Sequence, residues 1–198
     1  MSRRFLILHG WQNRRPDGHW QRWLAERLRG AGEQVLYPQL PDPDAPRLDA
    51  WREVLDAELA FLGDGERVVI AHSLGCLLWL QHARHARPEQ AVDRLLLVCP
   101  PSASRLPRTL AAFTEPVPGG ALRRSVRRPP ELVCTDDDPW CPEGARALYD
   151  DPASGLRVHV VPGAGHLSLD EGYGPWPAVE QWALTGRLAP EPALARFR

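Results

Sequence analysis

Short, almost uninterrupted apolar runs recur along this chain, and they alternate with segments in which apolar residues repeat at helical spacing. Almost wholly apolar strands are typical of a parallel sheet that is covered on both faces. The alternation therefore predicts an α/β fold with a doubly wound, mainly parallel sheet of about six strands. The expected strands are Phe5–Leu8, Gln34–Tyr37, Arg67–Ala71, Arg94–Cys99, Glu131–Thr135 and Arg157–Val161.

The segments between these strands have the apolar spacing of amphipathic helices. Residues 100–130 break the alternation, are rich in proline and predict a long loop, in which the basic cluster at 123–128 is interpreted as a solvated face. We expect one domain over residues 1–186 and a peripheral tail over 187–198, because the tail is interrupted by prolines. The expected helices lie near 20–30, 51–62, 142–149 and 176–182, and a further one begins after Ser73 with Leu74, Leu77 and Leu78.

Charge and hydropathy exclude two classes of partner. The chain has 24 basic and 25 acidic residues, a net charge of -1, so it lacks the positive excess that a nucleic-acid-binding protein needs. Its longest apolar runs fall far short of the roughly 20 residues of a membrane span. We therefore expect neither nucleic acid nor a membrane as a partner, and the sequence leaves the oligomeric state open.

The amino terminus and the cysteines indicate a cytoplasmic location. The first apolar run covers about four residues, which is too short for the core of a signal peptide. The four cysteines form no C-x-x-C pair and have no ligand spacing typical of zinc. We interpret them as buried free thiols in a reducing compartment, and we expect no metal and no cofactor. They are Cys76, Cys99, Cys134 and Cys141.

The segment from Ala71 to Gly75 is the strongest functional signal. It reads Ala-His-Ser-Leu-Gly, follows an apolar strand and precedes a helical pattern, as in the G-x-S-x-G nucleophile elbow with alanine in place of the first glycine. The turn is tight, so small residues are needed two positions before and after the serine. Ser73 is therefore the candidate nucleophile, and a tight turn with a capping serine is the alternative.

A serine nucleophile needs a base and an acid that orients the base, and in this kind of fold they follow in the order acid, then histidine. His166 comes after the last expected strand behind a Gly-x-Gly loop and is the candidate base, whereas His159 lies within that strand. Asp138 is the candidate acid because it precedes Pro139 and a helix expected to begin at Pro142. The alternatives Asp136 and Asp137 are interpreted as turn or solvated residues.

Backbone N–H groups should stabilise the negative charge that develops on a substrate carbonyl. One candidate donor is the N–H of Leu74, directly after the serine. The other is the N–H of Trp11, in the loop after the first strand, where Gly10 permits close approach of the backbone. The alternative is that Gly10 only forms a turn while Trp11 packs.

These motifs together resemble the small serine hydrolases of the α/β-hydrolase superfamily, the YdeN-type family that also includes a vertebrate retinoblastoma-binding protein. The resemblance spans about 5–182, and Ala71 is its visible departure. It implies a single-domain α/β-hydrolase fold without a large cap and a triad of Ser73, Asp138 and His166. The matching segments are 7–11, the helix around Trp20 and Trp23, 72–76, 137–142 and 165–166.

We therefore expect an esterase or amidase that cleaves a small acyl substrate through an acyl-enzyme intermediate. Haloperoxidase or acyltransferase chemistry would use the same triad. The alternative from another class is a binding protein with little turnover, since Leu132–Asp136 superficially resembles an L-x-C-x-E docking motif. That run is better interpreted as a buried strand, and a complete triad favours catalysis.

Overall fold

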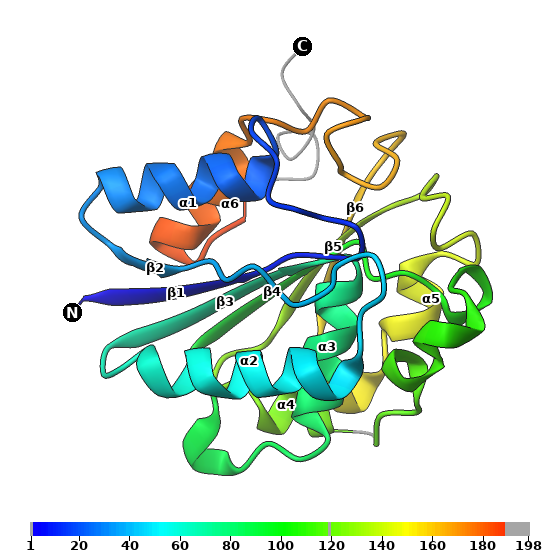
Figure 1. Ribbon diagram of the computed structural model, residues 1–198, viewed down its shortest axis with the longest axis horizontal. Coiled ribbons are helices and arrows are strands. Elements are labelled where there is room, and N and C mark those ends of the chain that lie inside the picture. Colours follow the sequence, from blue (N-terminus) through cyan, green and yellow to red (C-terminus); the bar gives the residue numbers. More distant parts are fainter. Residues whose placement is uncertain (1, 119, 189–198) are drawn as a thin grey trace.

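A parallel β-sheet forms the centre of the molecule. The computed structural model of the chain describes residues 2–118 and 120–188. In this part of the chain the strands are β1 (Arg3–Leu8), β2 (Gln34–Leu36), β3 (Glu66–His72), β4 (Arg94–Val98), β5 (Glu131–Thr135) and β6 (Arg157–Val161). They form one six-stranded sheet in the order β2–β1–β3–β4–β5–β6, with every neighbouring pair parallel (Figure 1). The predicted doubly wound sheet is confirmed.

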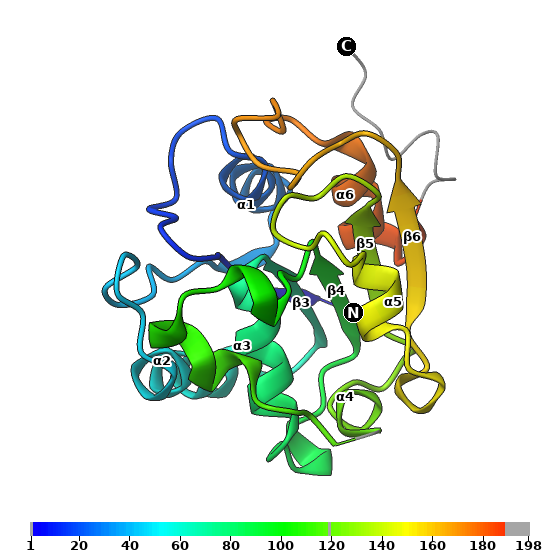
Figure 2. The same ribbon diagram turned by 90° about the vertical axis from the view of Figure 1, so that its right-hand side faces the viewer.

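Helices cover both faces of this sheet, as the apolar strands predict (Figure 1). The α-helices of the described residues are α1 (Trp20–Gly30), α2 (Leu48–Phe61), α3 (Leu74–Ala83), α4 (Ala121–Arg124), α5 (Ala145–Tyr149) and α6 (Pro177–Thr185). Helices α1 and α6 pack on one face, and α2 to α5 lie on the other side. Figure 2 looks toward the edge where the strands end, which is where open α/β sheets bind their ligands.

Alternate residues of each central strand supply the two cores. In β1, Phe5 and Ile7 pack into the core beneath α1 and α6, whereas Leu6 and Leu8 pack into the core beneath α2 and α3. All four side chains are fully buried. At about 25 cal/mol per Å² of apolar surface, burial of this kind is the main force that holds the helices on the sheet.

The edge strand β6 is less buried than the sequence suggests. Four of its five residues retain some exposure, and only Val161 is buried. It pairs with β5 on one side alone, so its apolar residues are not all enclosed. The interior strand β5, in contrast, buries Leu132, Val133 and Cys134, so the leucine and cysteine of the segment that resembles a docking motif are not accessible and only Asp136 at its end is exposed.

Two expectations about local structure are wrong. Residues 100–130 are not an unstructured loop, because they contain the 3-10 helices η2 (Ala103–Arg105) and η3 (Arg108–Thr114) as well as α4. Leu110 and Phe113 of η3 are buried against α2 and α3, which holds the segment on the core. The helix expected to begin at Pro142 begins at Ala145, since a turn that includes Gly144, with a φ angle of 83°, precedes it.

The remaining connections include η1 (Pro88–Gln90) and η4 (Pro152–Ser154). The arginines of the basic cluster are exposed, and Arg127 and Arg128 form ion pairs with Asp93 and Glu66, as a solvated face would. Across the described residues, every helix is too short or too polar to cross a lipid bilayer. Residues 189–198 of the expected tail lie outside the described residues, so that boundary stays a prediction.

Candidate active site

Ser73 occupies a strained turn between β3 and α3. Its φ and ψ angles are 55° and −127°, in a region that residues with side chains rarely adopt and that is often found at functional positions. A Cβ atom on Gly75 would lie 2.7 Å from the carbonyl oxygen of His9, so only glycine fits here. A Cβ on Gly10 would lie 2.6 Å from the Ser73 Cβ. Both glycines thus let the end of β1 approach the serine closely.

Ser73, His166 and Asp138 form one hydrogen-bonded chain. The Ser73 Oγ lies 2.9 Å from the His166 Nε2, and the His166 Nδ1 lies 2.9 Å from each carboxylate oxygen of Asp138. In a neutral imidazole Nδ1–H donates to Asp138, which leaves Nε2 free to accept the serine proton. The structure brings together the three side chains that the sequence singles out, in the geometry of a nucleophile, base and orienting acid.

The acid is fixed in place by its own loop. Asp138 is 5 % exposed, and its Oδ1 also accepts a hydrogen bond of 2.9 Å from the backbone N–H of Trp140. The carbonyl of Asp138 accepts from the N–H of Cys141. Because the turn after β5 holds both its backbone and its carboxylate, Asp138 can orient the imidazole without any contribution from a helix at Pro142.

Asp136 and Asp137 have a structural role that the sequence does not indicate. Asp136 Oδ1 accepts from the N–H of Gly163, and Asp137 Oδ1 accepts from the N–H of Gly165, each at 2.8 Å. They are exposed, as expected, but they also bind the loop that carries His166. The signal available in the sequence is topological: β5 and β6 are parallel neighbours, so the loops after them meet.

A cavity of about 300 Å³ opens beside Ser73. Trp11 and Trp140 form an aromatic wall, with ring centroids 5.9 Å apart in an edge-on arrangement. Pro101 and Leu106 of the 100–130 segment also line this cavity, as does Leu74. The two residues with the candidate oxyanion-hole N–H groups, Trp11 and Leu74, therefore share a cavity with the nucleophile. Leu74 is the first residue of α3, so its N–H has no partner within the helix.

Two of the histidines that line this cavity, His19 and His72, are buried and uncharged. Burial lowers the pKa of His19 from 6.5 to about 4 and lowers the pKa of His72 well below 6.5. Neither ring carries a positive charge near pH 7. Among the described residues that line the cavity no lysine or arginine occurs, and Asp170 contributes a carboxylate. The cavity is consequently suited to neutral groups and offers no counter-charge to an anion.

Three potential metal ligands meet beside the nucleophile. The Cys99 thiol, an Asp138 oxygen and a His166 ring nitrogen lie within 4.8 Å of one another. Burial raises the pKa of the Cys99 thiol well above 9, which keeps it protonated, whereas a metal binds the thiolate. The Asp138 oxygens already accept from His166. All four cysteines are buried, as expected, and none is joined to another by a disulfide.

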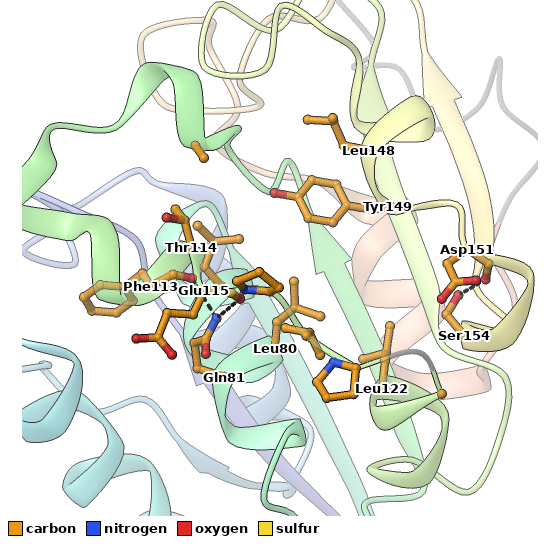
Figure 3. A pocket seen from close by; sticks show the side chains of 16 residues that line it. Leu80, Gln81, Phe113, Thr114, Glu115, Leu122, Leu148, Tyr149, Asp151 and Ser154 are labelled. Atoms are coloured by element: carbon orange, nitrogen blue, oxygen red, sulfur yellow. Dashed lines mark hydrogen bonds between the residues drawn. The ribbon is translucent and has the colours of Figure 1, made fainter.

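A second cavity of about 310 Å³ lies away from Ser73, between α3, η3, α4 and α5 (Figure 3). Its polar side chains are already engaged within the chain. The Gln81 amide donates to the carbonyls of Phe113 and Glu115, and the Tyr149 hydroxyl donates to the carbonyl of Pro101 at 2.6 Å. Its described lining residues include no paired nucleophile and base, so the candidate catalytic residues lie at the cavity beside Ser73.

Known proteins resemble this chain in sequence and in architecture. The Bacillus subtilis (strain 168) protein YdeN is 28 % identical over 184 residues, which cover 90 % of this chain and 93 % of YdeN. The crystal structure of the B. subtilis ydeN gene product superposes with a TM-score of 0.78 and 26 % identity, covering 94 % of this chain and 98 % of that one. A monoacylglycerol lipase from Paleococcus ferrophilus has the same fold, with a TM-score of 0.64, 17 % identity and coverage of 92 % and 94 %.

These likenesses place the fold in the α/β-hydrolase superfamily, as the sequence motifs imply. The family model described as serine hydrolase matches residues 5–184, which is nearly the whole described chain. This protein belongs to the serine hydrolase family.

Proposed function

We propose that this hydrolase is an esterase or amidase that cleaves small acyl substrates through Ser73, His166 and Asp138. The observation that carries the proposal is the hydrogen-bonded chain from the Ser73 hydroxyl through the His166 imidazole to the Asp138 carboxylate. A serine hydroxyl is a weak nucleophile until a base removes its proton, and this chain supplies the base and its orientation.

In the acylation step the Ser73 Oγ attacks the substrate carbonyl carbon while the His166 Nε2 takes the hydroxyl proton. The carbonyl oxygen becomes an oxyanion, for which the N–H groups of Trp11 and Leu74 are the proposed donors. The C–O or C–N bond to the leaving group then breaks. His166 gives its proton to that group, and the acyl group remains on Ser73 as an ester.

In the deacylation step water takes the place of the leaving group. His166 removes a proton from the water as its oxygen attacks the acyl carbon. The bond to Ser73 Oγ breaks, the proton returns to Ser73, and a carboxylic acid is released. Asp138 keeps its hydrogen bond to the His166 Nδ1 throughout and stabilises the imidazolium that forms in each step.

The size and charge of the cavity support a small, uncharged acyl substrate. A volume of about 300 Å³ lies at the lower end of the range of ligand pockets. The wall formed by Trp11 and Trp140 offers apolar surface for a short acyl chain. We also place the protein in the cytoplasm, because buried cysteines that form no disulfide are typical of a reducing compartment.

The direct test is covalent labelling by a fluorophosphonate probe, which reacts with an activated serine. Wild-type protein should be labelled and should hydrolyse p-nitrophenyl acetate, whereas Ser73→Ala should lose both activities and remain folded by circular dichroism. Ser104→Ala, at an exposed serine without a histidine partner, is the matched control and should be labelled like wild type. A folded wild-type protein that is neither labelled nor active would refute the proposal and favour a binding protein.

A further inference from the structure

The backbone of the loop that carries His166 is held at three consecutive carbonyl oxygens. Thr135 Oγ1–H donates to the carbonyl of Gly165 at 2.6 Å, and Trp20 Nε1–H donates to that of Leu167 at 2.9 Å. Between them, a ring nitrogen of His72 lies 2.9 Å from the carbonyl oxygen of His166 itself. Each bond comes from a side chain of a different element: the end of β5, the start of α1 and the end of β3.

This loop needs such support because its own backbone is irregular. Gly163, Gly165 and Leu167 all have φ angles between 51° and 62°, in the left-handed region. Leu167 is fully buried, although a residue with a side chain adopts this region only at a cost in strain. Buried carbonyls outside a helix or sheet ladder must find donors elsewhere, and here side chains supply them.

The middle bond has the clearest link to the chemistry. His72 is 3 % exposed, and because a carbonyl can only accept, its Nε2 must carry the proton in that bond. Its ring centroid lies 5.0 Å from that of His166 and 5.6 Å from that of Trp20, which packs edge-on against it. The ring is thus confined between the catalytic loop and α1, with a single donor that faces the His166 backbone.

His72 is also the residue directly before Ser73 and the last residue of β3. The strand that positions the nucleophile therefore also binds the backbone of the base. One rigid element controls both partners of the 2.9 Å contact between the Ser73 Oγ and the His166 Nε2.

We propose that His72 is a positioning residue, whose Nε2–H holds the His166 carbonyl so that the His166 ring stays in register with Ser73. The inference rests on the proposed hydrolase function and assigns no contact between His72 and the substrate. A misplacement of about 1 Å in a catalytic group can cost about 100-fold in rate, so the loss of one such bond should be measurable in kcat.

The test uses three substitutions at position 72 that differ in where they place a donor. His72→Gln carries an amide N–H at the same number of bonds from Cα as Nε2, His72→Asn carries it one bond closer to the backbone, and His72→Leu has no donor. Steady-state kinetics with p-nitrophenyl acetate should show a kcat lowered by about 10- to 100-fold in His72→Asn and His72→Leu. KM should stay within about twofold, and His72→Gln should recover most of the kcat.

If a substitution at position 72 unfolds the protein, two variants of Thr135 still test whether side-chain donors to this loop position His166. Thr135→Val removes the neighbouring hydroxyl donor at nearly constant shape and should lower kcat, whereas Thr135→Ser keeps the donor and should not. His85→Gln, at an exposed histidine, is the control for loss of an imidazole elsewhere. Equal kcat values in His72→Gln and His72→Asn, or a change confined to KM, would overturn the positioning role.

Failure of the proposed hydrolase function can be distinguished from failure of the role proposed for His72. If the hydrolase function fails, wild type and Ser73→Ala will be equally inactive. In that event the crystal structure of His72→Leu decides the inference. A His166 ring displaced from Ser73 would support it, and an unchanged distance between Ser73 Oγ and His166 Nε2 would overturn it.

Discussion

Lowering the pH from 7 to 5 should destabilise the fold through its buried histidines. Burial lowers the pKa of His9 and of His19 from 6.5 to about 4, and it lowers that of His72 well below 6.5. Below pH 6.5 the unfolded chain therefore binds protons that the folded protein excludes. The free energy of unfolding rises with pH wherever the unfolded state binds more protons, so it must fall as the solution is acidified through this range.

The size of the effect follows from the pKa values. A group with a pKa of about 4 in the folded protein and 6.5 in the unfolded chain lowers the free energy of unfolding by about 2 kcal/mol between pH 7 and pH 5. His9 and His19 together contribute about 4 kcal/mol, and His72 acts in the same direction. The free energy of unfolding of a typical protein is about 5–15 kcal/mol. A large part of it should therefore be lost at pH values above those at which carboxylates become protonated.

Urea unfolding followed by tryptophan fluorescence at pH 7 and pH 5 measures this loss. His19→Asn is the informative variant, because the His19 side chain accepts from the Gln21 N–H at the start of α1 and asparagine can keep that cap without titrating in this range. It should lose about 2 kcal/mol less than wild type, whereas His85→Asn should behave like wild type. Equal stability of the wild type at both pH values would refute the reasoning.

Two other predictions concern the proposed reaction. Asp138→Asn should lower kcat by up to about 10⁴-fold, because the Asp138 carboxylate accepts from the His166 Nδ1 and holds the imidazole in the tautomer that can act as a base. Asp136→Asn should have a much smaller effect, since its amide oxygen can still accept from the Gly163 N–H; comparable losses in the two variants would contradict the assignment. Across p-nitrophenyl esters from acetyl to palmitoyl, kcat/KM should fall beyond roughly eight carbons, given a cavity of about 300 Å³. A maximum at palmitoyl would show that the acyl chain lies elsewhere.

The sheet and the positions of the three candidate catalytic side chains follow from local sequence patterns. A run such as Leu95–Val98 is apolar at every position, which fits a central parallel strand. Ser73, Asp138 and His166 each follow one of the expected parallel strands. Because parallel strands all end at one edge of the sheet, their order along the chain was enough to predict that they meet.

The support of the site depends instead on the path of the loops. Nothing near Thr135 or Trp20 in the sequence indicates that both side chains donate to the loop around His166, since Trp20 lies 147 positions from its acceptor at Leu167. The ring direction of His72 depends on the strained turn at Ser73, so the sequence alone does not show that this ring contacts the His166 carbonyl. Long-range polar contacts of this kind have no periodic signal in the sequence.

The absence of lysine and arginine from the described lining of the cavity bears on how turnover ends. Hydrolysis converts a neutral ester or amide into a carboxylic acid, which ionises in water near pH 7. Among the described residues of the cavity the anion then has no lysine or arginine partner, His19 and His72 in its lining are neutral, and the carboxylate of Asp170 repels it. The same electrostatics that accept an uncharged ester thus favour departure of the product, and they weaken competition from carboxylates that accumulate in the surrounding solution.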